Sequence, residues 1–258
     1  MKAVIMAGGK GTRLSPDTLI LPKPLLPIGG EPIIVHIVRR LIASGARDLY
    51  VAVGYLGGLI ESYLTEFEKI PMGVRLAFVR EDEPLGTAGP LALIEPGRSP
   101  VLVTNGDVLT DLDYRKVLET HRAHGAAMTV ATCPRDFSTG FGTLEVDDAS
   151  RVVSFREKIV RREYVNMGVY ACGRPVWDHL GSGGRVDVPE LVVSLLNAGE
   201  RVIAHKFDGM WHDLGTPAEF AAAAGLFSDR RRGSSPAELI DAQNPETVTG
   251  AGQAKNGI

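Results

Sequence analysis

Apolar and polar positions repeat along the chain with two different periods, and the combination predicts an α/β fold. Short runs rich in β-branched residues predict strands, and the segments between them have the periodicity of helices. In the first half of the chain the expected strands are residues 2–7, 49–53, 74–79 and 101–104, and the expected helices are 33–44, 59–67, 88–94 and 114–124. This order predicts a mainly parallel sheet flanked by helices, in which ligands bind beyond the carboxyl ends of the strands.

From Met128 onward the pattern changes to strands with fewer helices between them. Further strands are expected at 128–132, 142–146, 152–156, 165–171 and 201–207, and helices at 174–180, 188–198 and 217–226. We interpret these strands as a smaller mixed-sheet extension that covers the other side of the cleft, within a single domain over residues 1–227. Residues 228–258 are rich in Ser, Gly, Pro, Ala and Asn, and we expect them to be a disordered tail.

The composition narrows the class of protein. A chain of 258 residues that is 44% hydrophobic can bury the core of one large α/β domain. Its formal charge of -3 indicates no overall basic field, so neither nucleic acid nor a membrane is an expected partner, and phosphate recognition has to be local. No apolar stretch reaches the roughly 20 residues that span a bilayer. The two cysteines fit no metal-ligand spacing and no secretory leader precedes the first strand, so a cytoplasmic location is expected.

The first expected strand leads directly into a glycine-rich loop, Gly8-Gly9-Lys10-Gly11-Thr12-Arg13. The loop matches neither a Walker A sequence nor the dinucleotide fingerprint, because Lys10 precedes Gly11 and Leu14 stands where a third glycine would be needed. Backbone N–H groups of such a turn can still hold phosphate oxygens. A tight turn with solvated cations is the simpler interpretation, but Arg13 and the proline-flanked Lys23 favour a phosphate site.

Together with motifs further along the chain, this opening resembles the sugar-1-phosphate nucleotidyltransferase family, and most closely its mannose-1-phosphate guanylyltransferase-like branch. The motifs come in the family's order and cover residues 1 to about 227. They are Gly8-Gly9-Lys10-Gly11-Thr12-Arg13-Leu14 with Lys23-Pro24, Pro84-Leu85-Gly86-Thr87-Ala88-Gly89, Asn105-Gly106-Asp107, Phe141-Gly142, Phe155-Arg156-Glu157-Lys158, Asn166-Met167-Gly168-Val169-Tyr170 and Trp211-His212-Asp213-Leu214-Gly215-Thr216-Pro217. The resemblance implies a Rossmann-like domain with a sugar-binding extension. Ile159 departs from the pattern, since a proline usually follows the lysine of that motif.

The resemblance assigns two carboxylates, Asp107 and Asp213, to metal binding. Asp107 follows the expected strand 101–104, so its side chain is expected at a carboxyl end of the sheet. Two carboxylates that meet beside a triphosphate suit Mg²⁺, whose remaining ligands would be phosphate oxygens and water. For an isolated Asp in a turn, a backbone cap is the more usual role.

The resemblance also implies how the substrates are held. Arg13 would hold the triphosphate, Lys23 would contact phosphates near the reacting centre, and Lys158 would contact the sugar phosphate. With Asp107 and Asp213, these residues make up the expected catalytic set. The expected nucleotide-binding residues are Ala7, Gly8, Gly9, Gly11, Thr12, Arg13, Glu81, Gly86 and Thr87, and the expected sugar-binding residues are Gly142, Glu157, Lys158 and Asn166. Without the motif context, Glu157 and Lys158 would be read as a solvated charge pair.

Glu81 is the residue that bears on the choice of base. A carboxylate can accept from guanine N1–H and N2–H₂ together, whereas uracil and thymine offer one N–H on that edge. The thymidylyltransferase branch usually carries a Gln at this place, so Glu81 favours a guanylyltransferase. The run Arg80-Glu81-Asp82-Glu83 is equally compatible with a solvated acidic surface.

The sequence therefore predicts an Mg²⁺-dependent enzyme that transfers a nucleoside monophosphate from an NTP, with GTP favoured, to a sugar 1-phosphate or a sugar-like cyclitol phosphate. A non-catalytic nucleotide-sugar-binding paralogue and a glycosyltransferase with a similar sheet are the two rival interpretations. The retained charge set, Arg13, Lys23, Asp107, Lys158 and Asp213, disfavours the first, and the triphosphate loop disfavours the second. The identity of the sugar and the oligomeric state stay open, and a homo-oligomer is compatible with the sequence.

Overall fold

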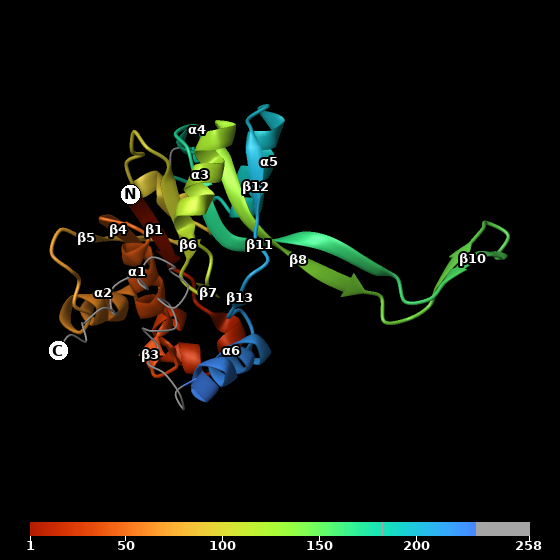
Figure 1. Cartoon of the computed structure of the whole chain (residues 1–258), viewed down its shortest axis with the longest axis horizontal. Helices are drawn as coiled ribbons and strands as arrows, with labels where there is room; N and C mark the ends of the chain where they lie inside the picture. Colours follow the sequence, from red (N-terminus) through yellow and green to blue (C-terminus); the bar gives the residue numbers. More distant parts are fainter. Residues whose placement is uncertain (182, 231–258) are drawn as a thin grey trace, which may run out of the picture.

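The fold is one seven-stranded mixed sheet with helices on both faces, and a long two-stranded arm projects from it (Figure 1). The computed structural model describes residues 1–181 and 183–230. The strands lie in the order β12-β8-β11-β6-β1-β4-β5. Their bounds are β1 Lys2–Ala7, β4 Asp48–Val53, β5 Arg75–Arg80, β6 Val101–Asn105, β8 Met128–Ser138, β11 Val160–Cys172 and β12 Val202–Lys206. β11 runs antiparallel to both of its neighbours, β6 and β8, while the other neighbouring strands of this sheet are parallel.

Alternation along the strands sorts the apolar side chains into two cores. On β1, Ile5 packs into one core and Val4 into the other, as the two-residue period of a strand requires. The core around Ile5 includes residues of α1 Ile33–Ala43, α2 Gly57–Glu66, α3 Tyr114–His124 and α6 Pro217–Arg230. The core around Val4 includes residues of the 3₁₀ helix η4 Gly89–Leu93, of α4 Pro175–Asp178 and of α5 Val188–Asn197. Because both faces of the sheet are covered, ligand access is left to the ends of the strands.

Local capping fixes the start and the end of the helices nearest to that edge. Asp113 accepts a hydrogen bond from the backbone N–H of Arg115 at the start of α3 (2.9 Å), and Gly125 ends the helix with φ 52°, in the left-handed region that favours glycine. α5 starts with a capping box in which the Asp187 and Glu190 side chains bond to each other's backbone N–H groups. These caps decide where the loops before and after each helix begin.

The prediction of a mixed, mainly parallel sheet flanked by helices is confirmed. Most strands of the main sheet agree with their predicted ranges to within two residues, but β8 ends six residues later and β11 begins five residues earlier than predicted. Residues 88–94 are an exception, because they form a 3₁₀ helix of five residues instead of an α-helix. Three short antiparallel pairs were not predicted as pairs: β2 Pro27–Ile28 with β3 Glu31–Pro32, β7 Val108–Thr110 with β13 Trp211–Asp213, and β9 Thr143–Val146 with β10 Val152–Arg156. The strands of the first two pairs have two or three residues and are too short to show a period, whereas β9 and β10 coincide with the strands expected at 142–146 and 152–156.

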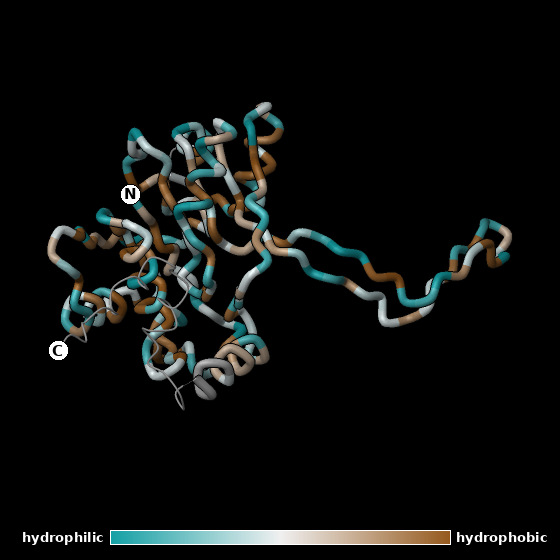
Figure 2. The backbone as a smooth tube through the Cα atoms, in the orientation of Figure 1, coloured by the Kyte–Doolittle hydropathy of each residue, from teal (hydrophilic) through white to brown (hydrophobic). Residues whose placement is uncertain are grey.

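The mixed-sheet extension differs from the expectation. Residues 128–132, 165–171 and 201–207 do not form a separate layer, because they lie in β8, β11 and β12 of the main sheet. Beyond the sheet, β8 and β11 continue as a paired ribbon that ends in the β9–β10 hairpin and projects far from the body of the molecule (Figure 1). We call residues 135–164 the arm. No residue of the arm is buried, and apolar and polar positions are interspersed along it (Figure 2).

The end of the chain is described only in part. α6 ends at Arg230, so the described helix continues three residues beyond the expected boundary at 227, and the rest of the expected tail lies outside the described residues. Within the described part of the chain, no helix is long and apolar enough to cross a membrane.

Candidate active site

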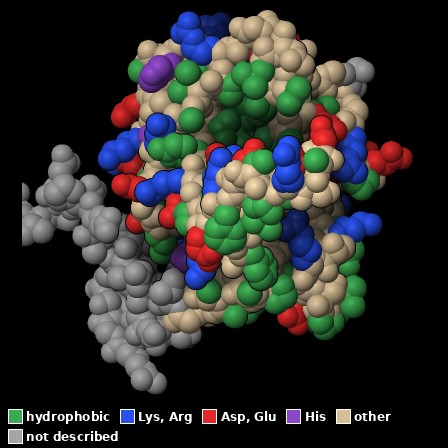
Figure 3. All heavy atoms as spheres, turned by 90° about the vertical axis from the view of Figure 1, so that its right-hand side faces the viewer, with side chains coloured by type: hydrophobic (Ala, Val, Ile, Leu, Met, Phe, Trp, Pro, Cys, Tyr) green, Lys and Arg blue, Asp and Glu red, His purple; other side chains and the backbone are tan. Residues whose placement is uncertain are grey.

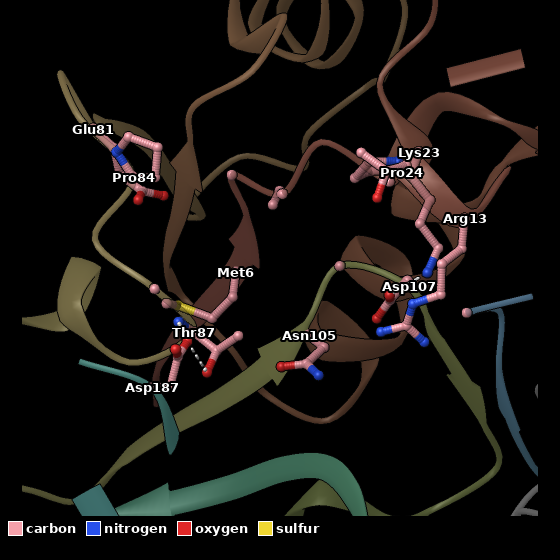
Figure 4. A pocket seen from close by; sticks show the side chains of 18 of the residues that line it. Met6, Arg13, Lys23, Pro24, Glu81, Pro84, Thr87, Asn105, Asp107 and Asp187 are labelled. Atoms are coloured by element: carbon pink, nitrogen blue, oxygen red, sulfur yellow. Dashed lines mark hydrogen bonds and ion pairs between the residues drawn. The ribbon is translucent and has the colours of Figure 1, made fainter. Parts of the chain in front are cut away.

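A cavity of about 470 Å³ opens at the carboxyl ends of β1 and β6 (Figure 4). This is the edge of the sheet at which the sequence predicts a ligand site. Polar, charged and glycine residues make up most of the lining. The lining residues are Met6, Ala7, Gly8, Gly9, Gly11, Thr12, Arg13, Lys23, Pro24, Glu81, Pro84, Gly86, Thr87, Asn105, Gly106, Asp107, Arg185, Asp187, Asp213 and Gly215.

The glycine loop after β1 forms one wall of this cavity. Gly11 lies in the left-handed region (φ 62°) and starts the 3₁₀ helix Thr12–Leu14, and its carbonyl accepts from the Thr18 hydroxyl at 3.0 Å. A Cβ on Gly8 would overlap the Glu81 carboxylate, and a Cβ on Gly54 would lie 2.9 Å from the Gly8 carbonyl oxygen. The loop backbone therefore packs closely against Glu81 and Gly54. Because its glycines carry no side chains, the cavity is left open for a ligand.

Lys23 is the most deeply buried cation of the cavity. It begins the 3₁₀ helix Lys23–Leu25 directly after Pro22, and only 9% of its surface is exposed. Its Nζ donates a hydrogen bond to Oδ2 of Asp107. A buried ammonium needs such a partner, because desolvation penalises an unpaired charge. Lys23 and Arg13 lie on the same side of the cavity as Asp107 (Figure 4).

Asp107 and Asp213 reach the cavity from two backbone segments that are held together. β7 and β13 pair so that Asp213 lies opposite Val108, and the Leu214 N–H donates to the Asp107 carbonyl at 3.2 Å. Burial raises the pKa of Asp213, the nearby Asp107 carboxylate raises it further, and Lys23 and Arg13 act in the opposite direction. The two carboxylates are thus close enough to repel each other.

These carboxylates suit a divalent cation. A Cβ on Gly215 would lie 3.2 Å from Oδ1 of Asp213 and 3.5 Å from Arg13, so Arg13 also reaches this end of the cavity. Among the described residues no group of three or more His, Cys, Asp or Glu side chains could enclose a metal. One or two carboxylates with phosphate oxygens and water is the donor set that Mg²⁺ takes beside nucleotides, so Asp107 and Asp213 fit that ion better than a soft transition metal.

The other end of the cavity contains Glu81 and the loop that follows it. Glu81 is partly buried, its Oε2 accepts from the Leu85 N–H at 2.9 Å, and burial raises its pKa. Gly86 has φ 81°, and a Cβ there would lie 2.6 Å from the Val186 carbonyl oxygen. Only glycine allows this close approach, which brings the loop against the segment before α5.

Two charged residues of the lining, Arg185 and Asp187, belong to none of the motifs found in the sequence. Asp187 accepts from the Thr87 backbone N–H at 2.9 Å and from its hydroxyl at 3.2 Å, and Arg185 bonds to the other oxygen at 3.0 Å. The Thr87 N–H and then Arg185 hold the pKa of Asp187 below its ordinary value. The spacing from Asp187 to Glu190, with Pro189 between them, marks a helix start. This local pattern does not indicate that the start of the helix faces the cavity, because the loop that it contacts there lies about a hundred residues earlier in the chain.

The expected nucleotide-binding residues all line this one cavity. They are Ala7, Gly8, Gly9, Gly11, Thr12, Arg13, Glu81, Gly86 and Thr87, together with the expected catalytic residues Lys23, Asp107 and Asp213. The structure thus brings together positions that span more than two hundred residues of sequence.

The expected sugar-binding residues are divided. Asn166 lies near the base of the arm, where it donates to the Tyr170 hydroxyl at 2.9 Å and accepts from the Gly168 N–H at 2.9 Å. Burial raises the pKa of Tyr170 to about 12, and Asp107 and Asp213 add to this, so Tyr170 lies within electrostatic range of both carboxylates. A Cβ on Gly168 would lie 2.7 Å from Nδ2 of Asn105, which lines the cavity, so Asn166 is held close to the lining although it is not part of it.

Gly142, Glu157 and Lys158 lie elsewhere, at the outer part of the arm. A Cβ on Gly142 would lie 2.7 Å from the Phe155 ring and 3.1 Å from Oε2 of Glu157, so these residues form one local cluster. Lys158 follows with φ 41°. The arm projects away from the body (Figure 1), and none of the three residues lines the cavity of its own chain. The reason is that β8 and β11 continue from the main sheet into the arm, so their pairing directs these residues away from the cavity.

The comparisons with known proteins agree with the motif order. The family model described as Nucleotidyl transferase matches residues 2–229. A mannose-1-phosphate guanyltransferase of Candida albicans is 34% identical over 235 residues, which cover 88% of this chain and 64% of that protein. A mannose-1-phosphate guanylyltransferase of Mycobacterium tuberculosis is 32% identical over 259 residues, which cover 98% of this chain and 70% of that protein. The chain thus spans about two thirds of the length of these relatives.

Solved structures of similar fold agree with these sequence comparisons. A protein of Bacillus anthracis that is assigned as a glucose-1-phosphate thymidylyltransferase, crystallised with sucrose, superposes with a TM-score of 0.71 at 26% identity, covering 89% of this chain and 96% of that one. HddC from Yersinia pseudotuberculosis superposes with a TM-score of 0.65 at 25% identity, covering 88% of this chain and 99% of that one. The similarity extends over nearly the whole length of both solved chains.

Proposed function

The chain belongs to the nucleotidyl transferase family, and from this premise we propose that it transfers the nucleoside monophosphate of an NTP to a sugar 1-phosphate, giving a nucleotide sugar and pyrophosphate. One observation carries this proposal. A glycine loop, two cations and two carboxylates that are far apart in sequence line a single cavity at the carboxyl edge of the sheet. That combination can hold a triphosphate, neutralise its charge and leave one side of it open to a second substrate.

The reaction needs little covalent chemistry from the protein. An oxygen of the sugar phosphate attacks the α-phosphorus, a new P–O bond forms, and the bond from the α-phosphorus to the pyrophosphate oxygen breaks. The attacking phosphate is already ionised at neutral pH, so no general base is required. Two anions have to be brought into line, and the rate enhancement therefore comes from positioning and charge neutralisation.

Each residue of the preformed cavity takes one part of that task. Backbone N–H groups of the glycine loop hold phosphate oxygens, and the Arg13 guanidinium stabilises charge that develops on the leaving pyrophosphate. Lys23 contacts phosphate near the reacting centre, and Asp107 holds the Lys23 ammonium in place. Because Lys23 is buried, its charge acts with little solvent screening.

Asp107 and Asp213 are the residues that would hold Mg²⁺. When bound, the ion would neutralise phosphate charge and orient the triphosphate. Burial and then the neighbouring Asp107 carboxylate raise the pKa of Asp213, and a divalent cation held by both carboxylates would offset their repulsion.

The base and the sugar follow from Glu81 and from the relatives. The Glu81 carboxylate faces the end of the cavity opposite Arg13 and can accept from two N–H groups of guanine (Figure 4). The two relatives described above are named for mannose 1-phosphate and guanine nucleotide. We therefore propose GTP as the nucleotide and a hexose 1-phosphate of the mannose type as the acceptor.

A release assay tests the proposal. The purified chain is incubated with Mg²⁺ and every pair from a panel of five nucleoside triphosphates and several sugar 1-phosphates, and pyrophosphate is measured. Release that depends on both substrates, fastest with GTP, is the expected result. No release with any pair would leave the non-catalytic paralogue as the better interpretation. Transfer of sugar from a nucleotide sugar to an acceptor, without pyrophosphate chemistry, would favour the glycosyltransferase.

A further inference from the structure

The arm exposes an unusual amount of apolar surface. A two-stranded ribbon with both faces in water is marginally stable by itself. In the arm, most large hydrophobic side chains are more than half exposed, and exposed apolar surface of this extent is typical of an interaction site. These side chains are Phe137, Phe141, Leu144, Val146, Val152, Val153, Phe155, Val160 and Tyr164. Viewed from the side on which the arm projects, hydrophobic side chains lie among charged ones on the surface (Figure 3).

The outer hairpin groups its apolar residues by register. Phe155 lies opposite Leu144, and Val152 lies opposite Val146, so each pair shares one face of the ribbon. Phe155 also packs over Gly142 and beside the Glu157 side chain. The apolar surface and the residues expected to contact the sugar phosphate are therefore parts of the same structure.

Most of the positive charge in the cavity is already paired with carboxylates. Its lining cations in the described chain are Arg13, Lys23 and Arg185. Lys23 is paired with Asp107 and Arg185 with Asp187, which leaves little positive charge for a second phosphate substrate. Lys158 would supply that charge, but it lies on the arm.

The arm is not a flexible loop that can bend back over its own cavity. β8 and β11 pair without interruption from Val160 opposite Ser138 to Asn166 opposite Thr132, and the register shifts only between Asn166 and Tyr170. The same two strands continue into the main sheet, so the backbone ladder aims the arm outward (Figure 1). A fold-back would have to break this ladder or bend it sharply.

From these observations we infer that the arm docks on a second copy of this chain and places Glu157 and Lys158 at the sugar-phosphate side of that copy's cavity. This inference rests on the proposed function. In a two-fold dimer each copy donates an arm and receives one. Lys158 of one copy would then supply the cation at the cavity of the other copy. A receiving surface is present beside the cavity, since Leu19 and Ile20 are 64% and 76% exposed within the segment that links Arg13 to Lys23.

A first experiment measures mass and needs no turnover. Light scattering of the full chain at micromolar concentration is expected to give a dimer. The double variant Phe141→Ser with Phe155→Ser is expected to give a monomer that keeps the circular dichroism spectrum of the folded sheet. Met72→Ser is the matched control, because Met72 is fully exposed outside the arm. A monomeric wild-type chain, or a double variant that stays fully dimeric, would overturn the inference.

A second experiment tests whether sites are shared. Arg13→Ala removes the cavity arginine, and Lys158→Ala removes the arm lysine. The two chains are co-expressed with different affinity tags, and the mixed dimer is isolated by tandem purification. If arms are exchanged, one of its two sites has both residues intact, so the mixed dimer is expected to show about half of the wild-type turnover, while either variant alone shows little.

The two failures can be told apart. If the arm serves its own chain, both sites of the mixed dimer carry a defect, and activity stays at the level of the single variants, which would refute arm exchange although the enzyme is active. If the wild-type chain itself releases no pyrophosphate, the proposed function fails, and the mass of the wild type and of the Phe141→Ser, Phe155→Ser variant still decides whether the arm joins two copies.

Discussion

The cavity at the carboxyl edge of the sheet and the arm hold their charged residues in different ways. In the cavity, Lys23 is buried and paired with Asp107, and the backbone of Leu214 bonds to that of Asp107. In the arm, no residue is buried, and Lys158 follows a cluster of exposed side chains. The cavity is organised by the core of its own chain, whereas the arm side chains are not enclosed by the chain that carries them.

The cavity and the arm therefore differ in how far their charged groups are preorganised. Catalytic groups act best when packing and hydrogen bonds fix them before the substrate arrives. In the proposed function, the cavity that would hold the nucleotide meets that condition within one chain. The residues proposed for the sugar phosphate would meet it only once the arm is covered, so we expect the two halves of the proposed site to respond differently to substitution.

The largest effect is expected at the preorganised half, from Asp107→Asn. The substitution removes one of two carboxylates for Mg²⁺ and the partner of the buried Lys23 ammonium. Turnover is expected to fall about 10³-fold, because metal neutralisation of phosphate charge contributes several kcal/mol. Pyrophosphate release under saturating substrates measures it. Asp208→Asn serves as the control, since Asp208 does not line the cavity. Unchanged turnover in Asp107→Asn would remove the basis for a metal site there.

Arg13→Ala is expected to lower turnover by about 10²-fold to 10³-fold, through loss of charge stabilisation on the leaving pyrophosphate. Lys10→Ala is the matched control, because Lys10 belongs to the same loop and loses the same charge but is exposed and does not line the cavity. Equal losses in both variants would mean that the loop acts through its overall charge and that Arg13 has no individual role.

Lys158→Ala tests the half that the arm carries. Its effect is expected to be smaller, a loss of about tenfold to a hundredfold in kcat/KM for the sugar 1-phosphate, which corresponds to one charge-assisted hydrogen bond. Affinity for GTP, measured by calorimetry, is expected to stay the same. Arg151→Ala is the control, since Arg151 pairs with Asp147 in the turn of the same arm. Weakened GTP affinity in Lys158→Ala would contradict the division of the site into two halves.

Glu81→Gln is expected to lower kcat/KM for GTP about tenfold, since an amide offers guanine one acceptor where a carboxylate offers two. Glu83→Gln is the matched control, because Glu83 is exposed and does not line the cavity. A base preference that does not change in Glu81→Gln would show that another part of the cavity selects the base.

The smallest effect is on stability and concerns the same residue. Burial raises the pKa of Glu81 in the folded chain, so the folded state binds this proton more tightly than the unfolded state does. Stability from this group is present at low pH and is lost as pH rises through the folded pKa. Glu81→Gln should therefore have a slightly higher Tm than the wild type at pH 7, and the difference should vanish in mild acid. A lower Tm at pH 7 would show that the ionised carboxylate stabilises the fold.

The order of the strands and helices could be predicted because each element carries its own periodic signal. β1 and α3 are long enough to show their periods, and the observed bounds of both agree with the predicted ranges. That Gly8 to Arg13 and Asp107 would meet in one cavity could be predicted for a related reason, since they directly follow strands, and the carboxyl ends of parallel strands meet at one edge. In both cases the information is local to a short segment.

Residues whose roles depend on distant partners were harder to predict. Arg185 and Asp187 line the cavity only because the Gly86 loop packs against the segment before α5. β7 and β13 consist of three residues each, and their pairing joins positions about a hundred residues apart. A contact of this kind depends on the whole fold and leaves no pattern in either segment.

The alternating elements, the glycine loop, the ordered motifs and hence the family can be read from the sequence, because these depend on spacing within short stretches of chain. That Asp213 meets Asp107, that Asp187 faces the cavity, and that Glu157 and Lys158 project on an arm is visible only in the folded chain. These positions depend on pairing between distant segments, as the ladder between β8 and β11 sets the direction of the arm. The sequence of the arm shows no pattern that distinguishes a ribbon folded over its own chain from one that extends away from it.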